Sequence, residues 1–175
     1  MFAQLDTKSV YSFMDSVVDL TTYIKRAKEL GYQALGLMDR DNLYAAYHFA
    51  QFASSKGLRP LIGMEANLFY EGRKIPFRLL AKNNQGYKNL MKLATELSSG
   101  QREFTAFSDY LNAIALILPS EDWEPGMTLG SEVFIGVRPE DAGKEFDYPV
   151  IPLHTVRYFE NVDRSTIQML HAISQ

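Results

Sequence analysis

Apolar residues follow two kinds of spacing along this chain. Short solid apolar runs, typical of strands buried on both faces, alternate with stretches that have the i, i+3, i+4 spacing of amphipathic helices. Strands are expected at 2–5, 34–38, 59–62, 66–70, 77–81, 113–118, 132–137 and 149–153, and helices at 19–30, 45–55, 83–97 and 162–173. This alternation predicts an α/β fold of parallel βαβ units, in which functional side chains gather at the C-terminal ends of the strands.

Composition narrows the class of protein further. A chain of 175 residues with 46% hydrophobic and 22% charged residues is typical of one globular domain. A net charge of -3 argues against a protein whose whole surface is basic and binds nucleic acid. The absence of cysteine excludes disulfides, thiolate metal sites and Cys nucleophiles, and it fits the cytoplasm. The first residues do not have the pattern of a signal peptide, and no apolar run of the sequence is long enough to span a membrane, so we expect no membrane segment in it.

Charged and polar side chains follow four of the expected strands. Because these strand ends should meet on one side of the sheet, we expect their side chains to converge there. The side chains in question are Asp6, Lys8, Asp39, Arg40, Glu65, Thr155 and Arg157.

Several blocks of sequence resemble a known family. Residues 2–12 (FAQLDTKSVYS), 24–31 (IKRAKELG), 59–66 (RPLIGMEA) and 149–159 occur in the order of the PHP (polymerase and histidinol phosphatase) domain family. The resemblance is closest to the PHP domains that open the alpha, or catalytic, subunits of bacterial DNA polymerase III, and it is weakest over 96–148. It implies a distorted (β/α)7 barrel. We expect this chain to contain most of that barrel, with its C-terminal part incomplete. It also implies a single PHP domain over 1–175, as the N-terminal fragment of a longer polymerase subunit.

The resemblance breaks at the positions that bind metal. Active members of the family hold zinc or manganese ions through His, Asp and Glu, and such sites hydrolyse phosphoesters. Here only the family's Asp and Glu at two positions are retained, as Asp39 and Glu65. The positions where the family has other ligands are occupied by Asp6, Lys8, Arg40, Pro76, Thr155 and Arg157.

We therefore expect no cofactor and no catalytic residue in this chain. Cations stand where neutral imidazoles would bind metal, and they should form ion pairs instead. The expected cations are Lys8, Arg40 and Arg157, and the expected carboxylates are Asp6, Asp39 and Glu65. Two alternatives stay open: a reduced Zn or Mn site built on the three carboxylates, and a phosphate-binding cluster built on the three cations. His48 and His171 are assigned no role, and His154, one position before the last motif, is expected to be a hydrogen-bonded structural residue at a strand end.

The resemblance implies a non-catalytic PHP domain with a structural and interaction role in DNA replication. Its expected partners are the downstream polymerase domains of the same subunit and a separate proofreading exonuclease subunit. DNA would be contacted only through the parent polymerase, and no membrane is involved. Two enzymatic alternatives remain, a metal-dependent phosphoesterase or 3′–5′ exonuclease using the reduced site, and a free-standing enzyme resembling histidinol phosphatase.

Overall fold

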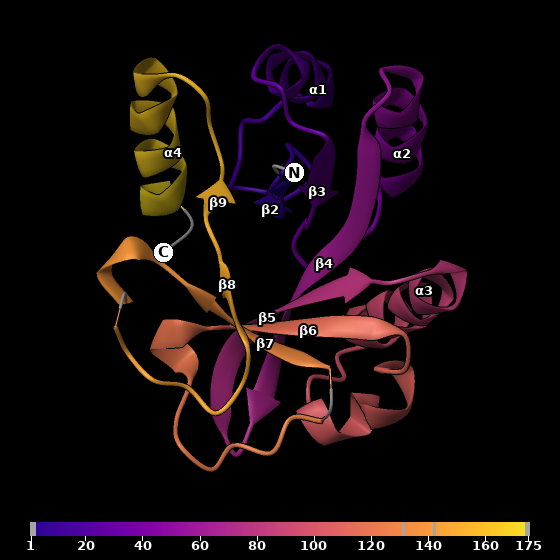
Figure 1. Cartoon of the computed structure of the whole chain (residues 1–175), viewed down its shortest axis with the longest axis vertical. Helices are drawn as coiled ribbons and strands as arrows, with labels where there is room; N and C mark the ends of the chain where they lie inside the picture. The colour runs from indigo at the N-terminus through magenta and orange to yellow at the C-terminus, as the bar shows by residue number, and fades with distance from the viewer. Residues whose placement is uncertain (1–2, 131, 142, 174–175) are drawn as a thin grey trace.

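The computed structural model describes residues 3–130, 132–141 and 143–173, so that Phe2 of the first predicted strand lies outside the described residues. A curled seven-stranded sheet forms a half-barrel with helices packed against it (Figure 1). Its strand order is β1-β3-β4-β5-β6-β7-β8. The strands are β1 (Ala3–Gln4), β3 (Ala34–Leu37), β4 (Arg59–Tyr70), β5 (Arg73–Ala81), β6 (Ile114–Pro119), β7 (Val133–Val137) and β8 (Val150–Pro152). The predicted α/β class and barrel type are confirmed.

A second, two-stranded sheet joins the two edges of the half-barrel. Strand β2 (Asp6–Thr7) continues β1, and β9 (Thr155–Val156) continues β8. These two strands pair in parallel, with Asp6 opposite Thr155. Glycine at position 36 of β3 allows the close approach of the β1–β2 junction, since a Cβ there would lie 1.9 Å from the Leu5 carbonyl oxygen. Residues from the two ends of the chain are therefore brought together at one end of the barrel.

The strand directions differ in part from the prediction of parallel βαβ units. Strand β5 pairs antiparallel with both β4 and β6. Strand β4 also runs without a break through 63–65, where the sequence predicted an interruption. A two-residue turn, Glu71 and Gly72, joins β4 to β5, and both residues have positive φ, as tight hairpins require. A solid apolar run indicates that a strand is buried on both faces. Strands β4 and β5 are buried in this way although they are antiparallel, so the apolar pattern did not reveal the direction of β5.

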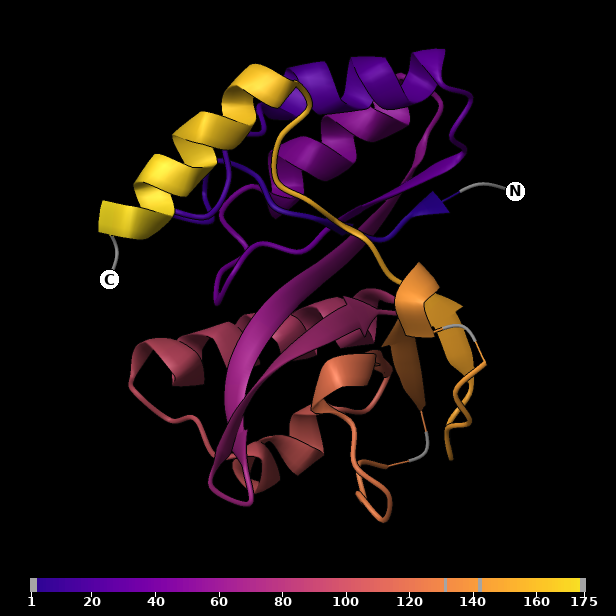
Figure 2. The ribbon, with the colours of Figure 1, turned by 90° about the vertical axis from the view of Figure 1, so that its left-hand side faces the viewer.

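Two hydrophobic cores hold the helices to the sheet. Helices α1 (Leu20–Glu29) and α2 (Ala46–Ser55) share a core with β3, whereas α3 (Asn84–Ser98) and the 3-10 helix η1 (Phe104–Tyr110) cover the larger core around β4, β5 and β6. Short 3-10 turns, η2 (Ser120–Asp122) and η3 (Pro139–Asp141), follow β6 and β7. The last helix, α4 (Asn161–Ile173), lies beside the N-terminal third of the chain (Figure 2). No helix in the described ranges is long and apolar enough to cross a membrane.

The i, i+3, i+4 spacing of the predicted helices places Leu30, Met91 and Ile173 on the apolar, inward stripes, but the structure exposes all three. Leu30, Met91 and Ile173 are 64%, 43% and 67% exposed. Leu30 is the C-cap of α1, where the helical spacing no longer applies. Met91 lies at the edge of the apolar stripe of α3, whose buried leucines are Leu90 and Leu97, as predicted, together with Leu93.

The N-terminus of α1 gives a first testable prediction. The Asp19 carboxylate accepts hydrogen bonds from Thr22 N (2.8 Å) and Thr22 Oγ1 (2.9 Å), as an N-cap residue does. We expect Asp19→Ala to lower the free energy of unfolding in urea by about 1 kcal/mol. The control is Asp19→Asn, which keeps the accepting oxygen and should lose much less. An equal loss in both variants would contradict the capping role.

Candidate functional site

The ammonium group of Lys8 lies at the centre of a buried cluster of charges. Lys8 follows β2 and is fully buried. Its Nζ donates to Asp6 Oδ1 (2.8 Å) and to the Met38 carbonyl oxygen (2.6 Å), and it lies 3.0 Å from Glu65 Oε2. An ammonium has three N–H donors, so these three oxygens satisfy it. Lys8 therefore has no donor left for a phosphate, which argues against the phosphate-binding alternative.

A second buried cation, Arg78, binds the same two carboxylates. It lies on β5 directly opposite Glu65 of β4. Arg78 Nε donates to Asp6 Oδ2 (3.0 Å), and its NH2 lies 3.3 Å from Glu65 Oε2. Its NH1 donates to the carbonyl oxygen of Pro76 (2.7 Å). Thr155 Oγ1 adds a hydrogen bond to Asp6 Oδ2 (2.7 Å), so both oxygens of Asp6 are occupied.

The ion pairs continue outward to the surface through Asp15. Arg40 Nε donates to Glu65 Oε1 (2.9 Å) and its NH2 donates to Asp15 Oδ2 (2.8 Å). Arg157 Nε donates to Asp15 Oδ1 (2.9 Å), and His171 Nε2 of α4 lies 3.1 Å from the same oxygen. We call this continuous network the ion-pair cluster. Its members are Asp6, Lys8, Asp15, Arg40, Glu65, Arg78 and Arg157.

Asp39 has a different role from the one predicted. It is buried beside the cluster, but among the described residues it makes no ion pair. Its carboxylate accepts hydrogen bonds from Ser9 N, Ser9 Oγ and Ser12 Oγ, each at 2.7 Å. The Arg40 backbone N–H donates to Ser12 Oγ (3.1 Å). Asp39 therefore ties the loop after β2 to the loop after β3.

Burial and ion pairing shift the pKa values of the two central carboxylates, Asp6 and Glu65, in opposite directions. Burial alone would raise the pKa of Asp6, but the charges of Lys8 and Arg78 and the hydrogen bonds from Lys8 and Thr155 outweigh it and lower the pKa to about 2. Burial would also raise the pKa of Glu65, but the charges of Lys8 and Arg78, with the hydrogen bond and charge of Arg40, outweigh it and lower this pKa. Both carboxylates are thus held in their charged form.

The structure brings together most of the predicted cluster and corrects its composition. Asp15 takes the place predicted for Asp39, and Arg78 is a fourth cation that sequence reasoning missed. Pro76, predicted at a former ligand position, takes part only as the carbonyl acceptor of Arg78. A lone Arg inside the apolar run at 77–81 was the available signal for a buried ion pair, since an unpaired charge is costly there.

The three histidines are placed differently from one another. His48 and His154 are exposed, and in the described part of the chain neither side chain joins the ion-pair cluster. His171, to which the sequence assigned no role, lies against Asp15 at the edge of the cluster.

The residues at this site do not fit a metal centre of the kind the family implies. The carboxylate oxygens of Asp6 and Glu65 already accept from an ammonium, two guanidinium groups and a hydroxyl, and those of Asp39 accept from Ser9 and Ser12. A divalent cation between Asp6 and Glu65 would have to displace the Lys8 ammonium and would be repelled by it. The described residues contain no group of three His, Asp or Glu that could hold a metal ion.

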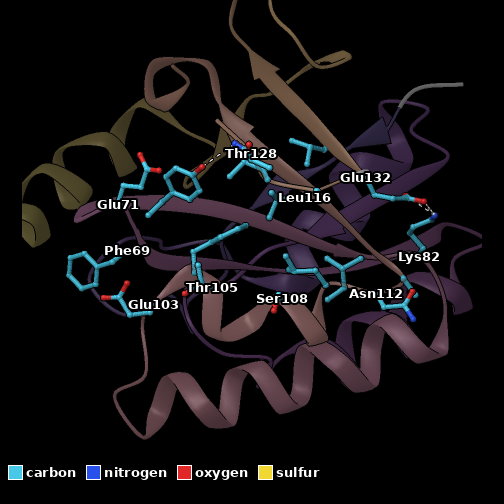
Figure 3. Close-up of a pocket in the computed structure, with 18 of the residues that line it drawn as sticks. Phe69, Glu71, Lys82, Glu103, Thr105, Ser108, Asn112, Leu116, Thr128 and Glu132 are labelled. Atoms are coloured by element: carbon cyan, nitrogen blue, oxygen red, sulfur yellow. Dashed lines mark hydrogen bonds and ion pairs between the residues drawn. The ribbon is translucent and has the colours of Figure 1, made fainter. Parts of the chain in front are cut away.

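Two hollows open at opposite ends of strands β6 and β7. A hollow of about 530 Å³ at the C-terminal ends of β6 and β7 borders the ion-pair cluster, and Arg78, Arg157, Arg138 and His154 line it. A larger one of about 950 Å³ lies at the opposite ends of the same strands (Figure 3). Its rim carries the Lys82–Glu132 ion pair, and its polar lining includes Thr105, Ser108, Asn112, Glu71 and Glu103. None of its lining residues belongs to the ion-pair cluster.

Comparison with known proteins assigns the family. Residues 4–124 match the model of the PHP domain, and the chain therefore belongs to the PHP domain family. It is 45% identical over 175 residues to DNA polymerase III subunit alpha of Streptococcus pyogenes serotype M1, matching its N-terminal region and covering 99% of this chain and 17% of that protein. It is 32% identical over 126 residues to DNA polymerase III subunit alpha of Bacillus subtilis (strain 168), covering 69% of this chain and 11% of that protein. The chain thus spans less than a fifth of the length of these relatives.

Solved structures show a looser likeness. A protein from Bifidobacterium adolescentis, described as a metal-dependent phosphoesterase, is 16% identical, with a TM-score of 0.46 and coverage of 54% of this chain and 32% of that one. An amidohydrolase from Chromobacterium violaceum is 20% identical, with a TM-score of 0.47 and coverage of 56% of this chain and 34% of that one.

Proposed function

We propose that this chain is a non-catalytic PHP domain, in which ion pairs replace the metal centre, at the start of the alpha subunit of a bacterial DNA polymerase III. The observation that carries the proposal is the position of the Lys8 ammonium between Asp6 and Glu65, 2.8 Å and 3.0 Å from their oxygens. A cation held by the protein itself neutralises the carboxylates there. The cluster joins the first and last strands and so fixes the geometry of this end of the barrel. An intact buried ion pair adds little net free energy of folding, because the cost of removing two charges from water offsets their attraction.

The homology to the alpha subunit supports a role in DNA replication. In this proposal residues 1–175 form one domain of a cytoplasmic replication protein. The domain packs against the polymerase domains that follow it in the subunit and presents a surface for a proofreading exonuclease. Contact with DNA and nucleotidyl transfer belong to those other domains, so this chain alone has no polymerase activity.

Metal content tests the proposal directly. After incubation with Zn²⁺ or Mn²⁺ and desalting, we expect elemental analysis to find less than roughly 0.1 ion per chain, because a structural or catalytic site needs three or four free ligands. The full-length subunit should likewise show no hydrolysis of phosphodiesters that depends on Asp6, Asp39 or Glu65.

The opposite result has an equally definite meaning. One or more tightly bound ions per chain, lost in Glu65→Ala but kept in the control Glu132→Ala, would establish the reduced metal site and overturn the proposal. Glu132 is a suitable control because its ion pair with Lys82 is at the surface, remote from the cluster.

A further inference from the structure

Large apolar side chains are exposed on the two loops that Asp39 joins and on the start of α2. They are Val10, Tyr11, Phe13, Tyr44 and Tyr47, with exposed fractions from 49% to 83%, and we call them the aromatic surface. The rings of Tyr11 and Tyr44 meet edge to face, 6.5 Å apart. Asn42 Nδ2 donates to the Tyr11 carbonyl oxygen (3.1 Å), which links the two loops at the surface as well. Exposed apolar patches of this kind mark interaction sites.

The aromatic surface has no charged residues of its own. Residues 9–14 and 42–55 contain no Asp, Glu, Lys or Arg. The solvent face of a surface helix normally carries charges, whereas α2 exposes Tyr47, His48 and Gln51. Single-stranded nucleic acid needs cations beside the stacking aromatics. Lys8 and Arg40, the nearest cations along the chain, are each engaged with two carboxylates. The chemistry therefore favours an apolar protein segment as the occupant.

Buried polar contacts hold the aromatic surface in place. The three hydrogen bonds that Asp39 accepts from Ser9 and Ser12 lie beneath Tyr11, within the same loop, and Arg40 N donates to Ser12 Oγ. Tyr44 N donates to Asn42 Oδ1 (3.1 Å). Loops ordered before binding lose less conformational entropy when a partner docks, which favours association.

The path of the chain indicates which segment docks there. Helix α4 returns to the loop after β2, where His171 Nε2 lies 3.1 Å from Asp15, two residues beyond Phe13. The relatives are several times longer than this chain, which covers 17% of the Streptococcus pyogenes protein. A segment that follows α4 in such a subunit starts close to Asp15, in the loop that carries Tyr11 and Phe13, and covalent linkage gives it a high effective concentration.

We infer that the aromatic surface docks an apolar part of the same polymerase subunit that follows α4 in the chain. This inference rests on the proposed function, because it requires the downstream polymerase domains. In this inference the loops after β2 and β3, which carry metal ligands in active members of the family, form a docking surface. Asp39 and the ion-pair cluster beneath these loops hold that surface in a fixed conformation.

Hydroxyl-radical footprinting of the full-length subunit tests this inference. Phe13 is 83% exposed in this domain, whereas Phe69, outside the aromatic surface, is 37% exposed. If the aromatic surface is covered, Phe13 should be oxidised severalfold more slowly than Phe69, at low and at high protein concentration alike. Tyr44 and Tyr47 should be protected with it. Faster oxidation of Phe13 than of Phe69 would overturn the inference.

Variants and concentration separate the possible occupants. In the full-length subunit, Phe13→Ser combined with Tyr44→Ser should expose Tyr47 to oxidation and lower the melting temperature. The control is Leu30→Ser, which removes an apolar side chain that is 64% exposed elsewhere on the domain and should change neither the oxidation of Tyr47 nor the melting temperature. If Phe13 is protected only at high protein concentration, a second copy of the subunit covers the aromatic surface. If protection needs an added exonuclease subunit, that separate partner covers it. Either result contradicts the inference. Metal uptake with Phe13 still protected would overturn the proposed function alone.

Discussion

Replacing Lys8 with methionine should lower the free energy of unfolding by about 3–5 kcal/mol, the range found when one partner of a buried ion pair is removed. Methionine has a similar length, so packing changes little, but Asp6 and Glu65 lose the ammonium that both of them contact. Among the described residues, Arg78 would then be the one cation left in contact with both buried carboxylates, and Arg40 would contact Glu65 only. The measurement is urea unfolding of the chain followed by circular dichroism.

Two further variants make the cause visible. Lys82→Met removes a cation that pairs with Glu132 at the surface, where both side chains are about half exposed, and it should cost no more than about 1 kcal/mol. Combining Lys8→Met with Asp6→Asn removes one charge of each sign, so the double variant should be more stable than the sum of the single losses predicts. A Lys8→Met variant as stable as the wild type would show that the ammonium is not needed to neutralise the site.

Acid should destabilise the chain through Asp6. The pKa of Asp6 in the folded chain, about 2, lies below its unfolded value of 3.8, so its contribution is fully present above pH 4 and is lost as the pH falls towards 2. This difference corresponds to about 2 kcal/mol. Glu65, whose pKa is lowered as well, adds a loss in the same direction. Urea unfolding at a series of pH values measures the slope.

A non-ionising variant isolates the contribution of Asp6. Asp6→Asn should be less stable than the wild type at neutral pH but should lose less stability on acidification. Asp109→Asn, at an exposed position on η1, should keep the wild-type slope. If Asp6→Asn and the wild type show parallel pH profiles, the ion pairs do not lower the pKa of Asp6.

The sequence by itself determined the class of fold, the family and the side of the barrel on which the charges meet. Solid apolar runs that alternate with amphipathic helices indicate buried strands in an α/β fold, and strand ends in such a fold converge. This reasoning placed Asp6, Lys8, Arg40, Glu65 and Arg157 in one cluster, and the structure brings them together. The resemblance to the PHP family, compared residue by residue, identified cations at positions where the family has metal ligands.

Only the tertiary structure decided which charges pair. Burial on both faces looks the same for parallel and antiparallel strands, so the apolar pattern did not reveal that β5 returns along β4. That register sets Arg78 opposite Glu65, and cross-strand neighbours are within reach of each other. Asp15 pairs with two arginines because its loop folds back over β2, whereas Asp39 binds Ser9 and Ser12. Contacts between distant segments depend on register and loop path, which local sequence pattern does not encode.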